Sequence, residues 1–292
     1  VGAMGRPRMT DVEHERHGDS GCGDRFLEKW SQHTPAEAAK ALTGMGIALV
    51  ADSKHLSVVT DRLGSRPAYA GRDRSNRLCV VGSHLESVAR LAGREHDFDS
   101  TSIGELVVHN YVTFPFTSRN GVLELDPGSI TRCAFDSVHP QITAEPYWTP
   151  IEPDQWPTED AMREELMDAL SFAGDDVTRG CRRVAVTLSG GKDSRAVMGA
   201  VPSDRLAMAL TYCTRENRES QIAGEVADAF GVPQFLVMRD PEFYVRLLEL
   251  GTALLGTELK ANAHGLCVAE CNELPDIDLV LGGQLSDTLL KD

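Results

Sequence analysis

The stretch from Val184 to Ser194 constrains the fold of this chain more than any other. It begins with a short apolar run rich in β-branched residues, which predicts a buried strand. The chain then turns at Gly190-Gly191, and the following residues predict a helix that ends before Pro202. A glycine turn that leads into a helix exposes backbone N–H groups, and the helix dipole favours negative charge at the same place. The stretch therefore predicts an anion-binding loop.

The side chains of the loop extend this prediction. Ser189 and Ser194 can donate hydroxyl hydrogen bonds to phosphate oxygens, whereas Asp193 would repel phosphates unless Mg²⁺ bridges them. The spacing differs from the G-x-x-x-x-G-K-[ST] loop of kinases and GTPases. The alternative interpretation is a glycine turn that only joins two elements.

Ser-Gly-Gly-x-Asp-Ser after a buried strand resembles the pyrophosphate loop of the N-type ATP pyrophosphatases. The resemblance implies ATP and Mg²⁺ as cofactors, with cleavage of ATP between its α- and β-phosphates. Enzymes of that group adenylate a carboxylate or a carbonyl. The motif alone does not identify the substrate.

Segments upstream of the loop resemble the asparagine synthetase family. Residues 61–69 read D-R-x-G-x-R-P-x-Y, and similar matches follow in order at 80–86, 114–117 and 125–129. The resemblance implies a partial class II glutaminase domain of the Ntn-type α+β fold, with two stacked sheets, ahead of the ATP-binding domain. The nucleophile of such glutaminases is a cysteine at the mature N-terminus.

The N-terminal residues depart from this pattern. The chain opens Val1-Gly2, and Cys22 is a poor candidate because the residues after it do not continue as a strand. The segment between Cys22 and Asp61 also has too few residues for the missing sheet. We therefore expect a shortened, silent glutaminase domain that does not hydrolyse glutamine.

A second motif near the end of the chain, residues 281–288, resembles the family's L-S-G-E-G-A-D-E segment. The resemblance implies that Asp287 binds metal together with Asp193. Gln284 replaces a glutamate that handles the acceptor, and Thr288 replaces a second acidic residue. The alternative interpretation is a strand followed by a polar loop.

Strands alternate with helices after residue 184, which predicts an α/β domain with a parallel sheet. Ligands bind beyond the carboxyl ends of such strands, so we expect the strands preceding Asp193 and Asp287 to be near neighbours. The expected catalytic residues are Asp193, Asp287 and Gln284, with Asp193 and Asp287 as metal ligands. The expected cofactor-binding residues are Leu188, Ser189, Gly190, Gly191, Lys192, Asp193, Ser194, Thr211, Gly282 and Gly283.

These motifs divide the chain into four parts. We expect a mobile leader at 1–34, a partial class II glutamine amidotransferase-like domain at 35–148, a crossover linker and helix at 149–181, and the ATP pyrophosphatase domain at 182–292. The family has a further helical segment after this point, so we expect a homodimer or a separate chain that supplies it.

Composition limits the partners. The net charge of −15 argues against nucleic acid, and there is neither a membrane-length apolar run nor a signal-peptide core, so we expect a cytoplasmic protein. Seven scattered cysteines form no C-x-x-C pair, so the sequence suggests neither a disulfide framework nor a zinc site.

The resemblance favours an AMP-forming amide ligase of the asparagine synthetase type that acts on small-molecule carboxylates and amines. An intramolecular amide former like the β-lactam synthetases and lasso-peptide cyclases is a second reading. A tRNA sulfur transferase would need catalytic cysteines and a basic surface. A non-catalytic nucleotide-binding remnant is the remaining alternative.

Overall fold

The computed structural model describes residues 2–9, 22–134, 142–256, 266 and 276–283. The chain divides into two compact units. The first contains residues 1–152 and 252–260, and the second contains residues 153–251 and 261–292. None of the helices within the described residues is both long enough and apolar enough to span a membrane.

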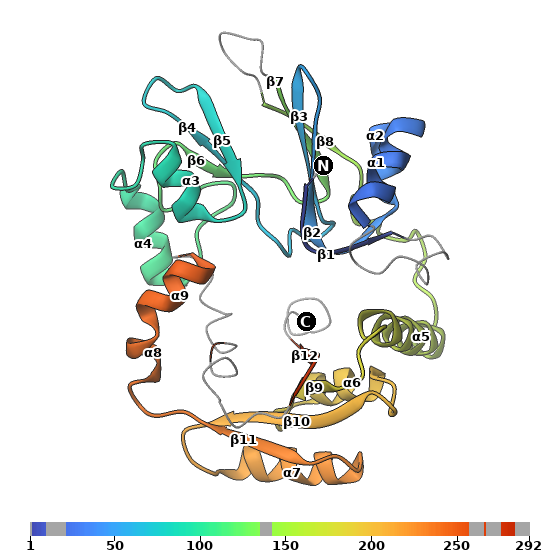
Figure 1. Cartoon of the computed structure of the whole chain (residues 1–292). Coiled ribbons are helices and arrows are strands. Elements are labelled where there is room, and N and C mark those ends of the chain that lie inside the picture. Colours follow the sequence, from blue (N-terminus) through green and yellow to red (C-terminus); the bar gives the residue numbers. More distant parts are fainter. Residues whose placement is uncertain (1, 10–21, 135–141, 257–265, 267–275, 284–292) are drawn as a thin grey trace. The chain divides into compact units, whose positions relative to one another are not determined.

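The first unit contains two antiparallel sheets (Figure 1). The larger sheet has the strand order β1-β2-β3-β7-β8, with β1 Gly2–Met9, β2 Leu42–Ala51, β3 His55–Thr60, β7 Ser129–Ala134 and β8 Ile142–Pro146. The smaller sheet has the order β5-β4-β6, with β4 Tyr69–Arg72, β5 Leu78–Gly82 and β6 Val122–Glu124. A core of buried side chains from both sheets lies between them, including Ile47, Val58 and Ala70.

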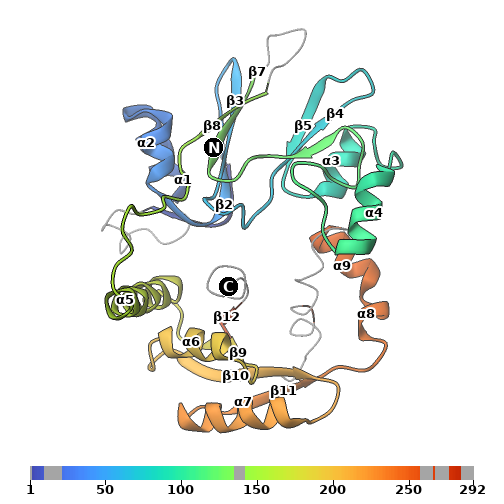
Figure 2. The ribbon, with the colours of Figure 1, turned by 180° about the vertical axis from the view of Figure 1, so that it is seen from behind.

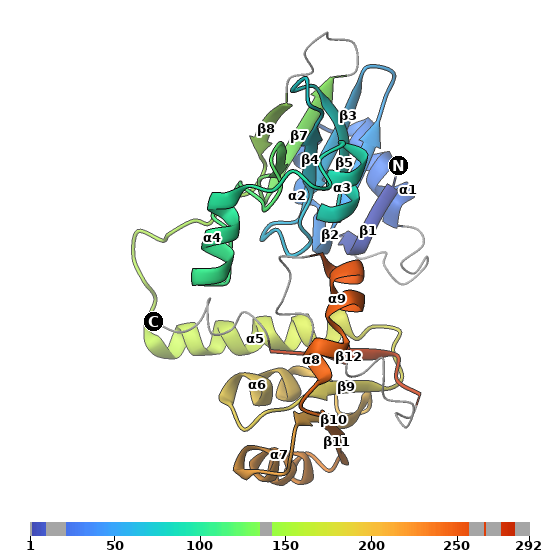
Figure 3. The same cartoon turned by 90° about the vertical axis from the view of Figure 1, so that its left-hand side faces the viewer.

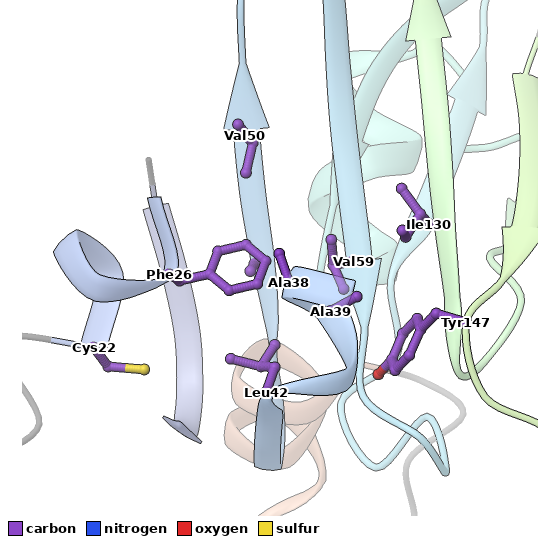
Figure 4. Close-up of a cluster of buried hydrophobic side chains, with 10 residues drawn as sticks. Cys22, Phe26, Ala38, Ala39, Leu42, Val50, Val59, Ile130 and Tyr147 are labelled. Atoms are coloured by element: carbon purple, nitrogen blue, oxygen red, sulfur yellow. The ribbon is translucent and has the colours of Figure 1, made fainter. Parts of the chain in front are cut away.

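Helices cover the outer faces of these sheets, as the view from behind also shows (Figure 2). The helices of this unit are α1 Cys22–Gln32, α2 Pro35–Lys40, α3 Leu85–Leu91 and α4 Ser100–His109. Phe26 of α1 and Ala38 of α2 pack with Val59 of the larger sheet (Figure 4). Leu85 and Val88 of α3 pack on Tyr69 of the smaller sheet. The expected two stacked sheets are present, with helices on both sides.

The predicted mobile leader at 1–34 is wrong for the residues that the structure describes. Residues 2–9 form β1, which pairs antiparallel with β2 from Gly2–Leu49 to Met9–Leu42. Cys22, Phe26 and Trp30 recur at every fourth position of α1, and the Phe26 and Trp30 rings lie 5.6 Å apart. Backbone pairing stabilises β1 despite its two glycines and its proline, and α1 has one apolar face.

Asp61, the first residue of the D-R-x-G-x-R-P segment, organises the turn after β3. Its buried carboxylate accepts hydrogen bonds from the N–H groups of Gly46, Leu63, Ser65 and Arg66 at 2.9–3.2 Å. Gly64 has φ +63°, a conformation that a side chain disfavours. The segment is therefore a hydrogen-bonded turn that joins the sheets of this unit.

Tyr147 follows β8, packs in the buried core and contacts the residue before Asp61. Its hydroxyl donates a 2.7 Å hydrogen bond to the carbonyl of Thr60. Burial, and then the nearby Asp61 carboxylate, raise the pKa of Tyr147 to about 12. The folded chain therefore keeps the phenol protonated at a pH where the unfolded chain loses the proton.

We expect Tyr147→Phe to lower the free energy of unfolding by about 1 kcal/mol at pH 7, the usual net value of one hydrogen bond. In the wild type, the contribution of Tyr147 is fully present below the unfolded pKa of about 10 and is lost as the pH rises towards 12. Urea unfolding of both proteins at pH 7 and pH 11 tests this. The stability difference should shrink at pH 11, and an undiminished difference would contradict the assignment.

The second unit contains a parallel sheet with the strand order β11-β10-β9-β12. Its strands are β9 Val184–Thr187, β10 Leu206–Cys213, β11 Gln234–Met238 and β12 Leu279–Leu281. The remaining helices are α5 Glu159–Val177, α6 Lys192–Ala200, α7 Arg218–Ala229, α8 Phe243–Arg246 and α9 Leu248–Leu255. The predicted parallel sheet is confirmed.

Helices α6 and α7 cover one face of this sheet (Figure 3). Val184 and Val186 point to that face, where they pack with Met198 of α6 and Ala223 of α7. Ala185 points to the opposite face and packs with side chains of β10. This alternation places β9 in the buried centre of the sheet, as expected for its apolar sequence.

Two features of the helices flanking the sheet depend on the fold. Helix α5 begins after its N-cap Thr158 and packs on α6, where Gly174 lies against Ala200. Helices α8 and α9 are separated at Leu247, whose φ of −94° and ψ of 3° end α8. Neither glycine nor proline marks this break, so the apolar periodicity alone could not reveal it.

Candidate functional site

The candidate site is the loop between β9 and α6. The N–H of Ser189 donates to Ser194 Oγ at 3.1 Å, and the N–H of Gly191 donates to Ser189 Oγ at 3.1 Å. The two hydroxyl oxygens themselves lie 3.1 Å apart. The serine side chains that were expected to donate to phosphate therefore brace the loop internally in this structure.

The start of α6 provides the anion-binding groups. Gly191 is the N-cap residue, and no side chain caps the helix there. The first N–H groups of a helix have no acceptor within it, so this end suits an anion. Arg195 Nη2 donates a hydrogen bond to the Gly190 carbonyl at 2.6 Å, which fixes the orientation of this carbonyl group beside the site. Lys192 is exposed and Asp193 is half-buried in the first turn.

Both glycines of the loop lie where a side chain would be crowded. A Cβ atom on Gly190 would lie 3.3 Å from Glu219 Cγ in the first turn of α7. A Cβ atom on Gly191 would lie 3.2 Å from Ser189 Oγ. The loop therefore packs tightly between its own serine and α7, and this packing accounts for two consecutive glycines.

The strand before the second motif lies directly beside β9. Leu279 pairs with Val184 and Leu281 with Val186, in parallel. The Asp278 carboxylate holds this register by accepting hydrogen bonds from the N–H groups of Arg182 and Arg183, which lower the pKa of Asp278. The predicted neighbour relation between the two strands is thus confirmed.

The glycines after β12 contact the loop. A Cβ atom on Gly282 would lie 3.0 Å from Thr187 Oγ1, and one on Gly283 would lie 3.3 Å from backbone atoms of Asp193 and Ser194. The strand order reverses between β9 and β12, which is where parallel α/β sheets bind their ligands. Gln284, Asp287 and Thr288 lie outside the described residues.

Thr211 and Leu188 are buried beside the loop and are hydrogen-bonded to each other. Thr211, near the end of β10, donates from Oγ1 to the Leu188 carbonyl at 2.9 Å. Both residues are buried, so Thr211 supports the loop from behind. Sequence reasoning missed the next partner, Gln234, which donates to Thr211 Oγ1 at 3.0 Å. A polar residue at the start of an apolar strand was the available signal.

Among the residues that the structure describes, no group of three or more His, Cys, Asp or Glu side chains comes together. Cys22, the first residue of α1, is buried in the same core cluster as Phe26 (Figure 4). Burial raises the pKa of Cys79, Cys133 and Cys213, the opposite of what activates a nucleophilic thiol.

The match to a family model lies in the first unit. Residues 13–148 match the family model described as a glutamine amidotransferase domain, which is slightly less than half of the chain. A solved structure titled as the allosteric regulatory enzyme of purine biosynthesis is similar to 79% of this chain, at 12% identity and a TM-score of 0.32. The match spans 58% of that protein's chain. Comparison with curated proteins gives no match.

Proposed function

We propose that the second unit binds Mg²⁺–ATP at the 188–194 loop, and that the chain is an AMP-forming amide ligase of the asparagine synthetase type. The observation that carries the proposal is the contact of Gly283 with the first turn of α6. It brings Gly282 and Gly283, which lie at the start of the second motif, to the same edge as the Ser-Gly-Gly loop. The glutamine amidotransferase match of residues 13–148 supports a function related to amide transfer.

The residues present fit a nucleoside triphosphate. The glycine turn leads directly into α6, whose start has no side-chain cap and would offer N–H donors to phosphate oxygens. Asp193 and Asp287 would hold Mg²⁺, which supplies positive charge against the pyrophosphate. Leu188 and Thr211 would keep the loop in place behind the ligand.

The remaining roles follow from side-chain chemistry. Fixed loop amides stabilise charge that develops on phosphate oxygens, so positioning and electrostatics account for most of the rate. Gln284 can orient an acceptor through its amide, but it cannot take a proton. An external amine, or an amine of the substrate itself as in intramolecular amide formers, would complete the reaction. A homodimer or a second chain would supply any residues that the site lacks.

Calorimetry with ATP, with and without Mg²⁺, tests the binding step. We expect Asp193→Ala to weaken Mg²⁺-dependent binding tenfold or more, since a charge-assisted contact is worth about 1.5–3 kcal/mol. Asp228→Ala is the matched control. Asp228 is exposed in the last turn of α7, whereas the first turn of α7 is the end that contacts the loop. Equal Mg²⁺-dependent affinities in all three proteins would contradict the site.

Exchange of labelled pyrophosphate into ATP distinguishes an active ligase from a non-catalytic nucleotide-binding remnant. A ligase should exchange labelled pyrophosphate into ATP when a suitable carboxylic acid from a panel is present. A non-catalytic nucleotide-binding remnant would bind Mg²⁺–ATP and show no exchange with any acid.

A further inference from the structure

We propose that Gln234 is a positioning residue for the 188–194 loop and acts through the hydroxyl of Thr211. Its effect on nucleotide affinity rests on the proposed function, whereas its effect on the loop does not. Gln234 is the first residue of β11 and is far from the loop in the sequence.

The hydrogen bonds of Gln234 have a fixed direction. Its Nε2 donates to Thr211 Oγ1 at 3.0 Å and to the carbonyl of Ser220 at 2.8 Å, which uses both amide protons. Thr211 has one hydroxyl proton, which it donates to the Leu188 carbonyl at 2.9 Å. The amide therefore donates to the hydroxyl, and the hydroxyl donates to the residue that begins the loop.

This arrangement joins two elements that flank the loop. Leu188 directly precedes Ser189, and Ser220 lies in the first turn of α7. Glu219 of the same turn lies against Gly190. Because Thr211 and Ser220 are 4% exposed, water cannot readily replace the amide. Gln234 thus fixes the distance between the end of β9 and the helix that packs on the glycine turn.

Gly224 provides the space for this amide. A Cβ atom on Gly224, in the interior of α7, would lie 2.9 Å from Gln234 Oε1. Glycine stabilises a helix interior less than alanine does, so its presence there calls for a reason. The colliding atom is the far end of a flexible side chain, so Gly224→Ala should displace Gln234 while α7 stays folded.

The test compares Gln234→Ala, Gly224→Ala and the double variant. Gly199→Ala is the matched control, since its new Cβ would have only an ordinary contact with Phe230, at 3.9 Å. Amide hydrogen exchange of residues 188–194 and Mg²⁺–ATP affinity are measured on the full chain, with urea unfolding to check the fold.

We expect both single variants to speed exchange in the loop and to weaken Mg²⁺–ATP binding about five- to tenfold. The double variant should resemble Gln234→Ala, because Gly224→Ala has nothing left to displace. Gly199→Ala should leave loop exchange and affinity unchanged.

Unchanged loop exchange in both single variants would overturn the role of Gln234. Additive effects in the double variant would also overturn it, since they would indicate independent packing defects. If the wild type does not bind Mg²⁺–ATP, the proposed function fails, and loop exchange alone decides the role of Gln234.

Discussion

Replacing Gly174 with alanine is expected to lower the free energy of unfolding of the second unit by about 3 kcal/mol or more, the upper range for an overpacked site. A Cβ atom at Gly174 would lie 1.9 Å from the Ala200 carbonyl oxygen and 2.6 Å from its carbon. Both are backbone atoms, so no rotamer change can relieve the overlap. Helix α5 must then separate from α6, the helix that begins with the candidate loop.

Urea unfolding followed by a probe in the second unit measures this effect. Gly199→Ala is a suitable control, because its Cβ has room and alanine favours the helix. Gly174→Ala should be far less stable than both wild type and control. A stability within about 0.5 kcal/mol of wild type, the usual range for a surface substitution, would contradict the close packing of α5 on α6.

Asp61→Ala is expected to have a comparable effect on the first unit. It removes a buried acceptor and leaves the N–H groups of Gly46, Leu63, Ser65 and Arg66 without a carboxylate. An unsatisfied buried group costs about 1–3 kcal/mol, and some of these groups can reach water, so we expect a loss of about 3–4 kcal/mol. Urea unfolding of the first unit provides the measurement.

Asp52→Ala is the matched control for Asp61→Ala. Asp52 also accepts backbone hydrogen bonds in a turn, from the N–H groups of Lys54 and His55, but it is exposed. Its loss should cost less than about 1 kcal/mol, since water can satisfy the N–H groups. Equal losses in the two variants would show that burial of the Asp61 carboxylate is not what matters.

Local sequence chemistry predicted the second unit well. The β-branched run at Val184 and the Gly190-Gly191 turn each act through near neighbours, and the structure places an element boundary at each. The parallel order of β9 and β12 followed from the alternation of strands and helices. These features depend on propensity and turn chemistry that a short window contains.

Longer-range interactions were not predictable in this way. Strand β1 is held by pairing with β2, more than thirty positions away in the sequence, so its glycines, arginines and proline resembled an irregular leader. The D-R-x-G-x-R-P segment was found by resemblance. The hydrogen bonds that its Asp61 carboxylate accepts from backbone N–H groups form only in the folded turn. Gln234 donates to Thr211 and lies beside Gly224 only because the fold brings these residues together.

In the proposed function, the Ser-Gly-Gly loop and the glycines after β12 form one site for Mg²⁺–ATP. Amide hydrogen exchange of the wild-type chain with and without Mg²⁺–ATP tests this proposal. We expect slowed exchange at residues 189–194 together with 282–283, and much less slowing with AMP, which lacks the pyrophosphate. Protection confined to other segments, or equal protection by AMP and Mg²⁺–ATP, would contradict it.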